Sequence, residues 1–166
     1  MSNVLVVGYG NVGKMVVNAI ENSSDMRVVM IADGTNHPDL STLQEHVDVI
    51  IDFSHPNNLE WIHPFVKKHK SAYICGTTGH NDLQAKQVEE LGAYAPIVFQ
   101  ANFSLGIAVF QEVLKMVTPM LEDGYDIEVV EKHHNQKQDA PSGTAKMLIN
   151  TMNPTHDYKE VHGRKI

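Results

Sequence analysis

After three residues the chain runs Val4-Leu5-Val6-Val7-Gly8-Tyr9-Gly10-Asn11-Val12-Gly13, an apolar segment followed by three glycines spaced G-x-G-x-x-G. Glycine is needed where a chain turns sharply after a strand, where backbone must touch a pyrophosphate, and where a helix packs closely on a strand. The following helix N-terminus supplies N–H donors for phosphates. The stretch predicts a strand–turn–helix unit that binds a dinucleotide, although a glycine turn in another α/β protein would show the same pattern.

An acidic residue at a suitable distance supports the dinucleotide reading. Asp33 ends the next apolar run, twenty residues after Gly13, where a carboxylate can hydrogen-bond an adenosine ribose. The same charge would repel a ribose 2′-phosphate, and residues 34–36 bring no cation. This favours NADH over NADPH as the cofactor. NADPH remains an alternative because Lys14 is a nearby cation.

The first hundred residues alternate short apolar runs with stretches of helical period. Parallel strands joined by crossover helices produce this alternation. The expected strands are 4–7, 28–32, 47–53, 72–75 and 97–100, and the expected helices are 12–20, 59–68 and 82–91. We therefore predict an α/β fold with a doubly wound parallel sheet of the Rossmann type.

The pattern changes after about residue 104. Residues 105–117 are apolar nearly all round, which predicts a buried helix leading out of the first domain. Residues 125–131 then alternate with period two, which predicts a strand of a different sheet. We expect a dinucleotide-binding domain over 1–103 and part of an α+β substrate-binding domain, incomplete, over 104–166.

Composition excludes several classes of function. Among 166 residues, 42% are hydrophobic and 20% are charged, which is the profile of a folded chain. The net charge of −7 and the lack of a basic block argue against nucleic acid or an anionic membrane as partner. No apolar run reaches the ~18 residues of a membrane span. The lone Cys75 and the absence of a leader predict a cytoplasmic protein.

Three further turns follow expected strands. They read Asp52-Phe53-Ser54-His55-Pro56, Gly76-Thr77-Thr78-Gly79 and Ala101-Asn102-Phe103-Ser104. In an open parallel sheet, ligands bind at the carboxyl ends of the strands. Any turn uses such residues, but three turns on one edge favour a site for a nicotinamide ribose and amide.

A dense group of polar residues follows the period-two segment. It reads Glu131-Lys132-His133-His134-Asn135-Gln136-Lys137-Gln138-Asp139-Ala140-Pro141-Ser142-Gly143-Thr144. The histidines and Lys137 combine a group suited to proton transfer with a permanent cation. The turn at 142–144 opens a helix over 145–149, whose N–H groups suit a carboxylate. Solvated loop histidines are one alternative. A metal site is another, but no HExxH or paired CxxC occurs, so we predict no metal.

These blocks, in this order, resemble the 4-hydroxy-tetrahydrodipicolinate reductase family, formerly called dihydrodipicolinate reductases. The most specific element is the run E-x-H-H-x-x-K-x-D-A-P-S-G-T at 131–144. The resemblance spans almost the whole chain. It implies an NAD(P)H-dependent oxidoreductase that reduces the cyclic product of aspartate semialdehyde and pyruvate, a small dicarboxylate, on the path to diaminopimelate and lysine.

The resemblance also implies roles for individual residues. His133 would be the proton donor or acceptor, and Lys137 a second proton donor that also holds a substrate carboxylate. Further substrate contacts would come from His134, Gly143 and Thr144. The cofactor would bind to Gly8, Tyr9, Gly10, Asn11, Val12, Gly13, Asp33, Gly76, Thr77, Thr78, Gln100, Ala101, Asn102 and Phe103.

Family members continue well past residue 166. They carry an Arg-Gly-Gly segment that completes the substrate pocket and further strands used in tetramer contacts. The resemblance therefore implies a chain truncated at its C-terminus, with a homotetramer as the full-length form. Two alternatives stay open: a non-catalytic nicotinamide-binding regulatory module, and a truncated reductase without turnover.

Overall fold

The computed structural model describes residues 1–34, 38–133, 135, 141–155, 159 and 161. It divides the chain into two units, Met1–Ala101 and Asn102–Ile166. The division lies two residues before the expected boundary between residues 103 and 104.

The first unit is built on a five-stranded parallel sheet with the strand order β2-β1-β3-β4-β5. The chain adds β2 on one side of β1 and the remaining strands on the other, which places a topological switch point between β1 and β3. The strands are β1 (Ser2–Val7), β2 (Met26–Ala32), β3 (Val49–Asp52), β4 (Ala72–Cys75) and β5 (Ile97–Phe99). The prediction of a doubly wound parallel sheet is confirmed.

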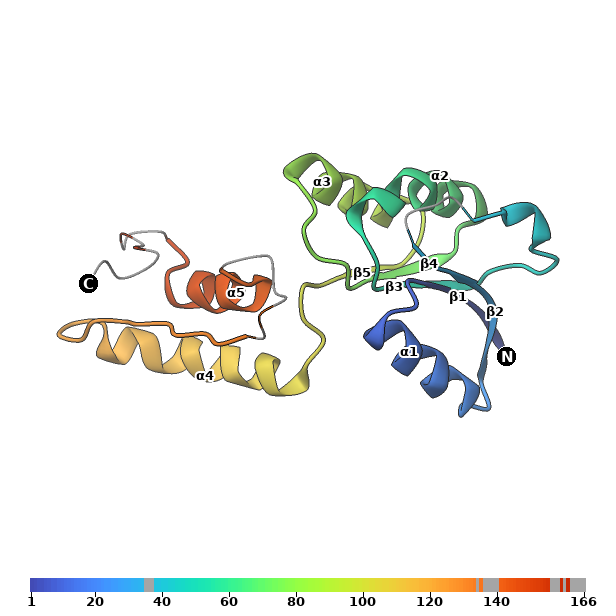
Figure 1. Ribbon diagram of the computed structural model, residues 1–166. Coiled ribbons are helices and arrows are strands. Elements are labelled where there is room, and N and C mark those ends of the chain that lie inside the picture. The colour runs from blue at the N-terminus through green and yellow to red at the C-terminus, as the bar shows by residue number, and fades with distance from the viewer. Residues whose placement is uncertain (35–37, 134, 136–140, 156–158, 160, 162–166) are drawn as a thin grey trace. The chain divides into compact units, whose positions relative to one another are not determined.

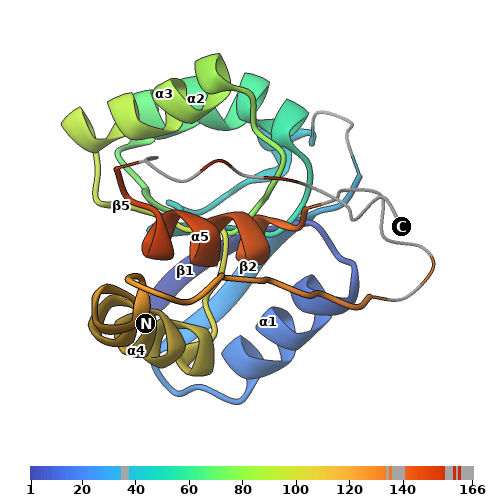
Figure 2. The ribbon, with the colours of Figure 1, turned by 90° about the vertical axis from the view of Figure 1, so that its left-hand side faces the viewer.

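Helices cover both faces of this sheet, as Figures 1 and 2 show: α1 lies on one face, and α2 and α3 lie on the other. Their bounds are α1 (Asn11–Glu21), α2 (Leu59–His69) and α3 (Asp82–Glu90). Successive residues of β1 point to opposite faces, so Val4 and Val6 join the apolar cluster with α1, while Leu5 and Val7 join the cluster with α2. This two-sided burial explains why β1 is apolar throughout.

A buried carboxylate organises the carboxyl end of β3. Asp52 is 1% exposed, and it accepts hydrogen bonds from the hydroxyls of Ser54, Tyr73 (2.8 Å) and Thr77 (2.8 Å). Burial, and then the negative charge of Asp52, raise the pKa of Tyr73 far above its usual range, so the phenol stays a donor. The bonds from Tyr73 and Thr77 tie β3 to β4 and to the loop after β4, and the bond from Ser54 holds the loop after β3.

The same network continues to the end of β2. The Thr77 hydroxyl accepts from the Ser54 amide at 2.7 Å. Asn58 donates to the Ser54 hydroxyl at 2.9 Å and to the Gly34 carbonyl at 3.0 Å, and Trp61 donates to Asn58 at 3.2 Å. The loops that follow β2, β3 and β4 are therefore joined by one set of hydrogen bonds.

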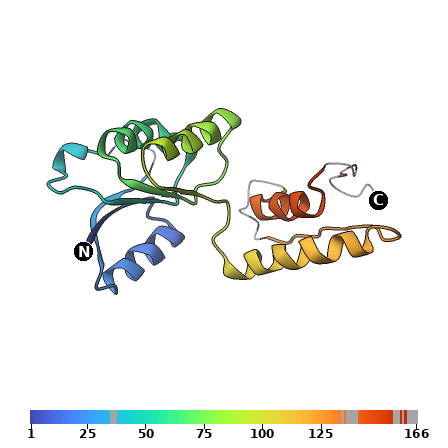
Figure 3. The same ribbon diagram turned by 180° about the vertical axis from the view of Figure 1, so that it is seen from behind.

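The second unit contains two helices that lie side by side, α4 (Leu105–Leu121) and α5 (Gly143–Met152) (Figures 1 and 3). Ser104 and Ser142 cap their N-termini by accepting from the Ile107 and Ala145 amides. No helix in the described part of the chain, α4 included, is both long and apolar enough to cross a membrane.

Two expectations for this unit are wrong. The helix expected to be buried is largely exposed: Thr118 is the buried residue of α4, whereas Leu105 is 80%, Met116 72% and Met120 77% exposed. Residues 125–131, expected to be a strand, form no ladder among the described residues. Both patterns require partner layers. Among the described residues of this unit, α5 packs against α4 but leaves most of the large apolar side chains of α4 exposed, and no strand pairs with residues 125–131.

Removal of one hydroxyl tests the Asp52 network. Thr77→Val keeps the side-chain shape but leaves Asp52 one donor short and the Ser54 amide without its acceptor. We expect the free energy of unfolding to fall by about 1–3 kcal/mol, measured by denaturant unfolding followed through Trp61 fluorescence. Thr78→Val, at the exposed neighbouring position, should change it by less than about 0.5 kcal/mol. Equal losses in the two variants would contradict the network.

Candidate functional site

A side chain would meet different surroundings at each of the three glycines after β1. Gly8 adopts φ +89°, and a Cβ there would lie 2.5 Å from the Phe53 carbonyl oxygen. A Cβ on Gly13 would collide with the Gly8 carbonyl. At Gly10, a Cβ would meet no heavy atom of the described chain within 4 Å. The fold itself therefore requires Gly8 and Gly13, whereas Gly10 leaves backbone open to a ligand.

The N-terminus of α1 follows directly. Gly10 is its N-cap, and among the described residues no side chain caps it. The first N–H groups of the helix can therefore serve an anion. Asn11 and Val12 are exposed in the first turn, and Lys14 places its Nζ 5.7 Å from the ring centroid of Tyr9. The loop combines open backbone, amide donors and one adjacent cation.

Asp33 lies against this loop. Its Oδ1 accepts from the Tyr9 amide at 3.1 Å and from the Gly34 amide at 2.9 Å. Asp33 follows directly on β2, whose end is bonded to the loop through Gly8 N and the Ala32 carbonyl at 2.7 Å. The structure brings together the acidic residue and the glycine loop, which are twenty residues apart in sequence.

The loop after β4 presents backbone more than side chains. Gly76 has no room for a Cβ because the Phe53 ring fills the space. Thr77 is 4% exposed and its hydroxyl is bonded to Asp52, so Thr78 carries the exposed side chain here. The backbone N–H of Gln100 donates to the Cys75 carbonyl at 3.1 Å. Gln100 is exposed at the same sheet edge, and Ala101 follows it.

In the second unit, a carboxylate joins His133 to the start of α5. Glu131 Oε2 lies 2.7 Å from His133 Nε2, and Glu131 Oε1 accepts from the Ser142 amide at 2.9 Å. The His133 side chain is 38% exposed and that of Glu131 28%. The predicted site residues His134 and Lys137 lie outside the described residues.

Two residues predicted for different ligands contact each other in this unit. Asn102, expected at the cofactor, donates from Nδ2 to the hydroxyl of Thr144, expected at the substrate, at 2.9 Å. Asn102 Oδ1 in turn accepts from the Ser104 amide at 2.7 Å. Gly143 precedes Thr144 as the first residue of α5, and Phe103 is 47% exposed.

No functional role was predicted for Glu131 from the sequence. Hydrogen bonding from the Ser142 side chain, from His133 and from the Ser142 amide, in that order, lowers its pKa to about 2. The signal was present in the E-x-H spacing, because residues two apart in an extended segment share a face. The partner eleven residues away, Ser142, could not be read from any local pattern.

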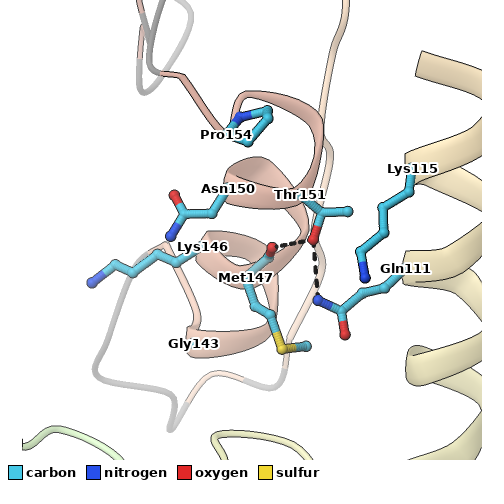
Figure 4. Close-up of a pocket in the computed structure, with 8 residues that line it drawn as sticks. All are labelled: Gln111, Lys115, Gly143, Lys146, Met147, Asn150, Thr151 and Pro154. Carbon is cyan, nitrogen blue, oxygen red and sulfur yellow. Dashed lines mark hydrogen bonds between the residues drawn. The ribbon is translucent and has the colours of Figure 1, made fainter. Parts of the chain in front are cut away.

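An open groove of about 700 Å³ runs between α4 and α5 (Figure 4). Gln111 donates to Thr151 at 3.1 Å across it, and Thr151 donates to the Met147 carbonyl at 2.8 Å. The groove is lined by Gln111, Lys115, Gly143, Lys146, Met147, Asn150, Thr151 and Pro154. Gly143 is the one predicted site residue among them.

Two other chemistries receive no support from the described residues. They contain no group of three or more histidine, cysteine or acidic side chains arranged to hold a metal ion. Cys75 is fully buried, and burial raises the pKa of its thiol to about 11. A thiol in that state is a poor nucleophile at neutral pH.

Acid titration tests the hydrogen bonds that Glu131 accepts. A carboxyl pKa lowered from 4.5 to about 2 on folding stabilises the folded state above pH 4.5, and this contribution is lost as the pH falls through about 2. We expect the carboxyl carbon resonance of Glu131 to titrate near pH 2 in an NMR experiment, with the Ser142 amide shift following it. A midpoint near 4.5 would mean that the bonds are absent in solution.

Comparison with known proteins identifies related sequences for both units. The model of "Dihydrodipicolinate reductase, N-terminus" matches residues 2–103, and that of "Dihydrodipicolinate reductase, C-terminus" matches residues 106–165. The 4-hydroxy-tetrahydrodipicolinate reductase of Clostridium novyi is 35% identical over 92% of this chain and 64% of its own length. That of Caldanaerobacter subterraneus is 38% identical over 93% of this chain and 65% of its own length.

A solved structure agrees at the level of the fold. The dipicolinate-bound dihydrodipicolinate reductase from Paenisporosarcina sp. TG-14 superposes with a TM-score of 0.71 at 23% identity, covering all of this chain and 71% of that one. The chain thus spans a little under two thirds of the length of the curated relatives it matches. With the matches to both family models, the chain belongs to the dihydrodipicolinate reductase family.

Proposed function

We propose that this chain carries the nucleotide-binding unit and the proton-transfer residues of a reductase that acts on 4-hydroxy-tetrahydrodipicolinate, using NADH or NADPH. The observation that carries the proposal is the pair of sites expected for such a reaction. One unit holds a glycine loop braced by Asp33, and the other holds His133 beside the N-terminus of α5.

The residues present fit a dinucleotide. The open backbone at Gly10 and the α1 N-terminus, which no described side chain caps, suit a pyrophosphate. Asp33 Oδ1 accepts from two amides, and Oδ2, which accepts from none of the described residues, suits the adenosine ribose hydroxyls. Its charge would oppose a 2′-phosphate, so we propose NADH as the preferred cofactor. When bound, the nicotinamide supplies the hydride.

The second unit supports the handling of a dicarboxylate. The first N–H groups of α5, at Gly143 and Thr144, suit a substrate carboxylate. The Thr144 hydroxyl accepts from Asn102, so its own proton remains to be donated to that carboxylate. In this proposal His133 gives a proton to the ring atom that gains negative charge when the hydride arrives. Lys137 and His134 stay predicted contacts to the carboxylates.

Two alternatives make a different prediction for the same assay. A regulatory binding module or an inactive truncated reductase would bind NADH and leave the substrate unreduced. The test is NADH consumption by this chain in the presence of substrate freshly generated from aspartate semialdehyde and pyruvate. The cytoplasmic location, and the homotetramer implied for the full-length form, stay predictions.

The cofactor preference is tested by a change of charge that preserves the loop. Asp33→Asn keeps an oxygen for the Tyr9 and Gly34 amides but removes the repulsion of a 2′-phosphate. We expect the ratio of the NADPH to the NADH dissociation constant, measured by calorimetry, to fall by about tenfold, or about 1.4 kcal/mol. Asp25→Asn, at the opposite end of β2, should leave the ratio unchanged. Equal ratios for wild type and Asp33→Asn would remove Asp33 from the ribose site.

The role of His133 is tested by a neutral replacement. His133→Gln keeps a polar side chain but has no group that exchanges a proton near neutral pH. We expect turnover to fall by at least about 100-fold, while the dissociation constant for NADH stays within a factor of about two. Equal losses of turnover and NADH affinity would overturn the proton-donor role.

A further inference from the structure

The carboxylate of Glu131 is shared between two partners. One oxygen contacts His133 Nε2 at 2.7 Å, and the other accepts from the Ser142 amide at 2.9 Å. Ser142 is 4% exposed and caps α5 through its hydroxyl. Glu131 is therefore attached at one end to a helix terminus and at the other to the imidazole ring.

The backbone around His133 offers no comparable support. Residues 125–133 belong to no helix and to no ladder within the described chain. A ring on such a segment is held by its side-chain contacts, and the contact recorded for His133 among the described residues is the one to Glu131. Among the described residues, this carboxylate is therefore the contact that orients the imidazole relative to α5.

We propose that Glu131 is a positioning residue, which holds His133 through Nε2 and turns Nδ1 toward the substrate. The proposal rests on the function proposed above. An ionised carboxylate only accepts hydrogen bonds, so the ring nitrogen that meets it carries a hydrogen. Nε2 therefore keeps its hydrogen throughout, and Nδ1 is the nitrogen that exchanges a proton.

In the proton-transfer step, His133 gives the proton on Nδ1 to the substrate. The cationic ring loses the hydrogen on Nδ1, and the bonding electron pair stays on Nδ1. The proton forms a new bond to the substrate atom that has become negative. The product ring is neutral, with its hydrogen on Nε2 bonded to Glu131. The low pKa of Glu131, about 2, keeps the carboxylate ionised in both states at neutral pH.

Glu131→Gln separates positioning from mere support of the helix. The amide can still accept from the Ser142 N–H through its oxygen, but its NH₂ group then faces the ring. Nε2 must become the acceptor, which moves the hydrogen of the neutral ring to Nδ1. We expect turnover to fall by at least about 100-fold, with the dissociation constant for NADH unchanged and the melting temperature lowered only slightly, because the charge that stabilises the folded state is lost. Glu112→Gln, which breaks only the exposed pair with Lys115, should leave all three quantities unchanged.

The tautomer itself is measured by nitrogen NMR of ¹⁵N-histidine-labelled protein. The neutral His133 ring should carry its hydrogen on Nε2 in the wild type and on Nδ1 in Glu131→Gln. An unchanged tautomer, or a switched tautomer with full turnover, would overturn the positioning role. A wild-type chain that binds NADH but does not reduce the substrate would overturn the proposed function instead, and the nitrogen spectra would still decide the orientation of the ring.

Discussion

The parallel sheet of the first unit depends on one buried charge among its described residues, the carboxylate of Asp52. Burying an ionised group is costly unless donors surround it, and here three hydroxyls do so. The donors come from β4 and from the loops after β3 and β4, so satisfying the charge fixes those loops in place. Through Asn58 the same network reaches the Gly34 carbonyl. This interaction therefore fixes the loops at the sheet edge that is predicted to bind the cofactor.

The sequence predicted this unit well because its signals are local. Apolar runs mark the strands, helical periods mark the helices, and the glycine spacing with Asp33 marks the loop where β1 meets α1. The direction in which each hydroxyl points could not be predicted from the local sequence. Thr77 reaches Asp52 because β3 and β4 align Asp52 with Cys75, and only that register turns the Thr77 side chain inward. The residue was correctly placed at the sheet edge, but its buried hydroxyl is engaged with the fold.

The second unit was predicted less well, for a physical reason. The apolar pattern of α4 and the alternation of residues 125–131 reflect the layers against which such segments pack. Among the described residues, α5 contacts only part of α4, and no strand pairs with residues 125–131. Exposed side chains such as Met116 and Met120 are the result. The contacts proposed to serve the chemistry include one short-range bond, from Glu131 to His133 two residues away, and one longer-range bond, from the Ser142 amide at the start of α5 to Glu131.

The three glycines after β1 look alike in sequence, but different pressures would preserve them in evolution. Gly8 and Gly13 are required by the packing of the chain on itself, so a descendant that no longer used a cofactor would still need them. A Cβ at Gly10 would meet no heavy atom of the described chain within 4 Å, so under the proposed function it is a bound molecule that would disfavour a larger residue there. A descendant that has replaced Gly10 but kept Gly8 and Gly13 would therefore have kept the fold and lost the ligand.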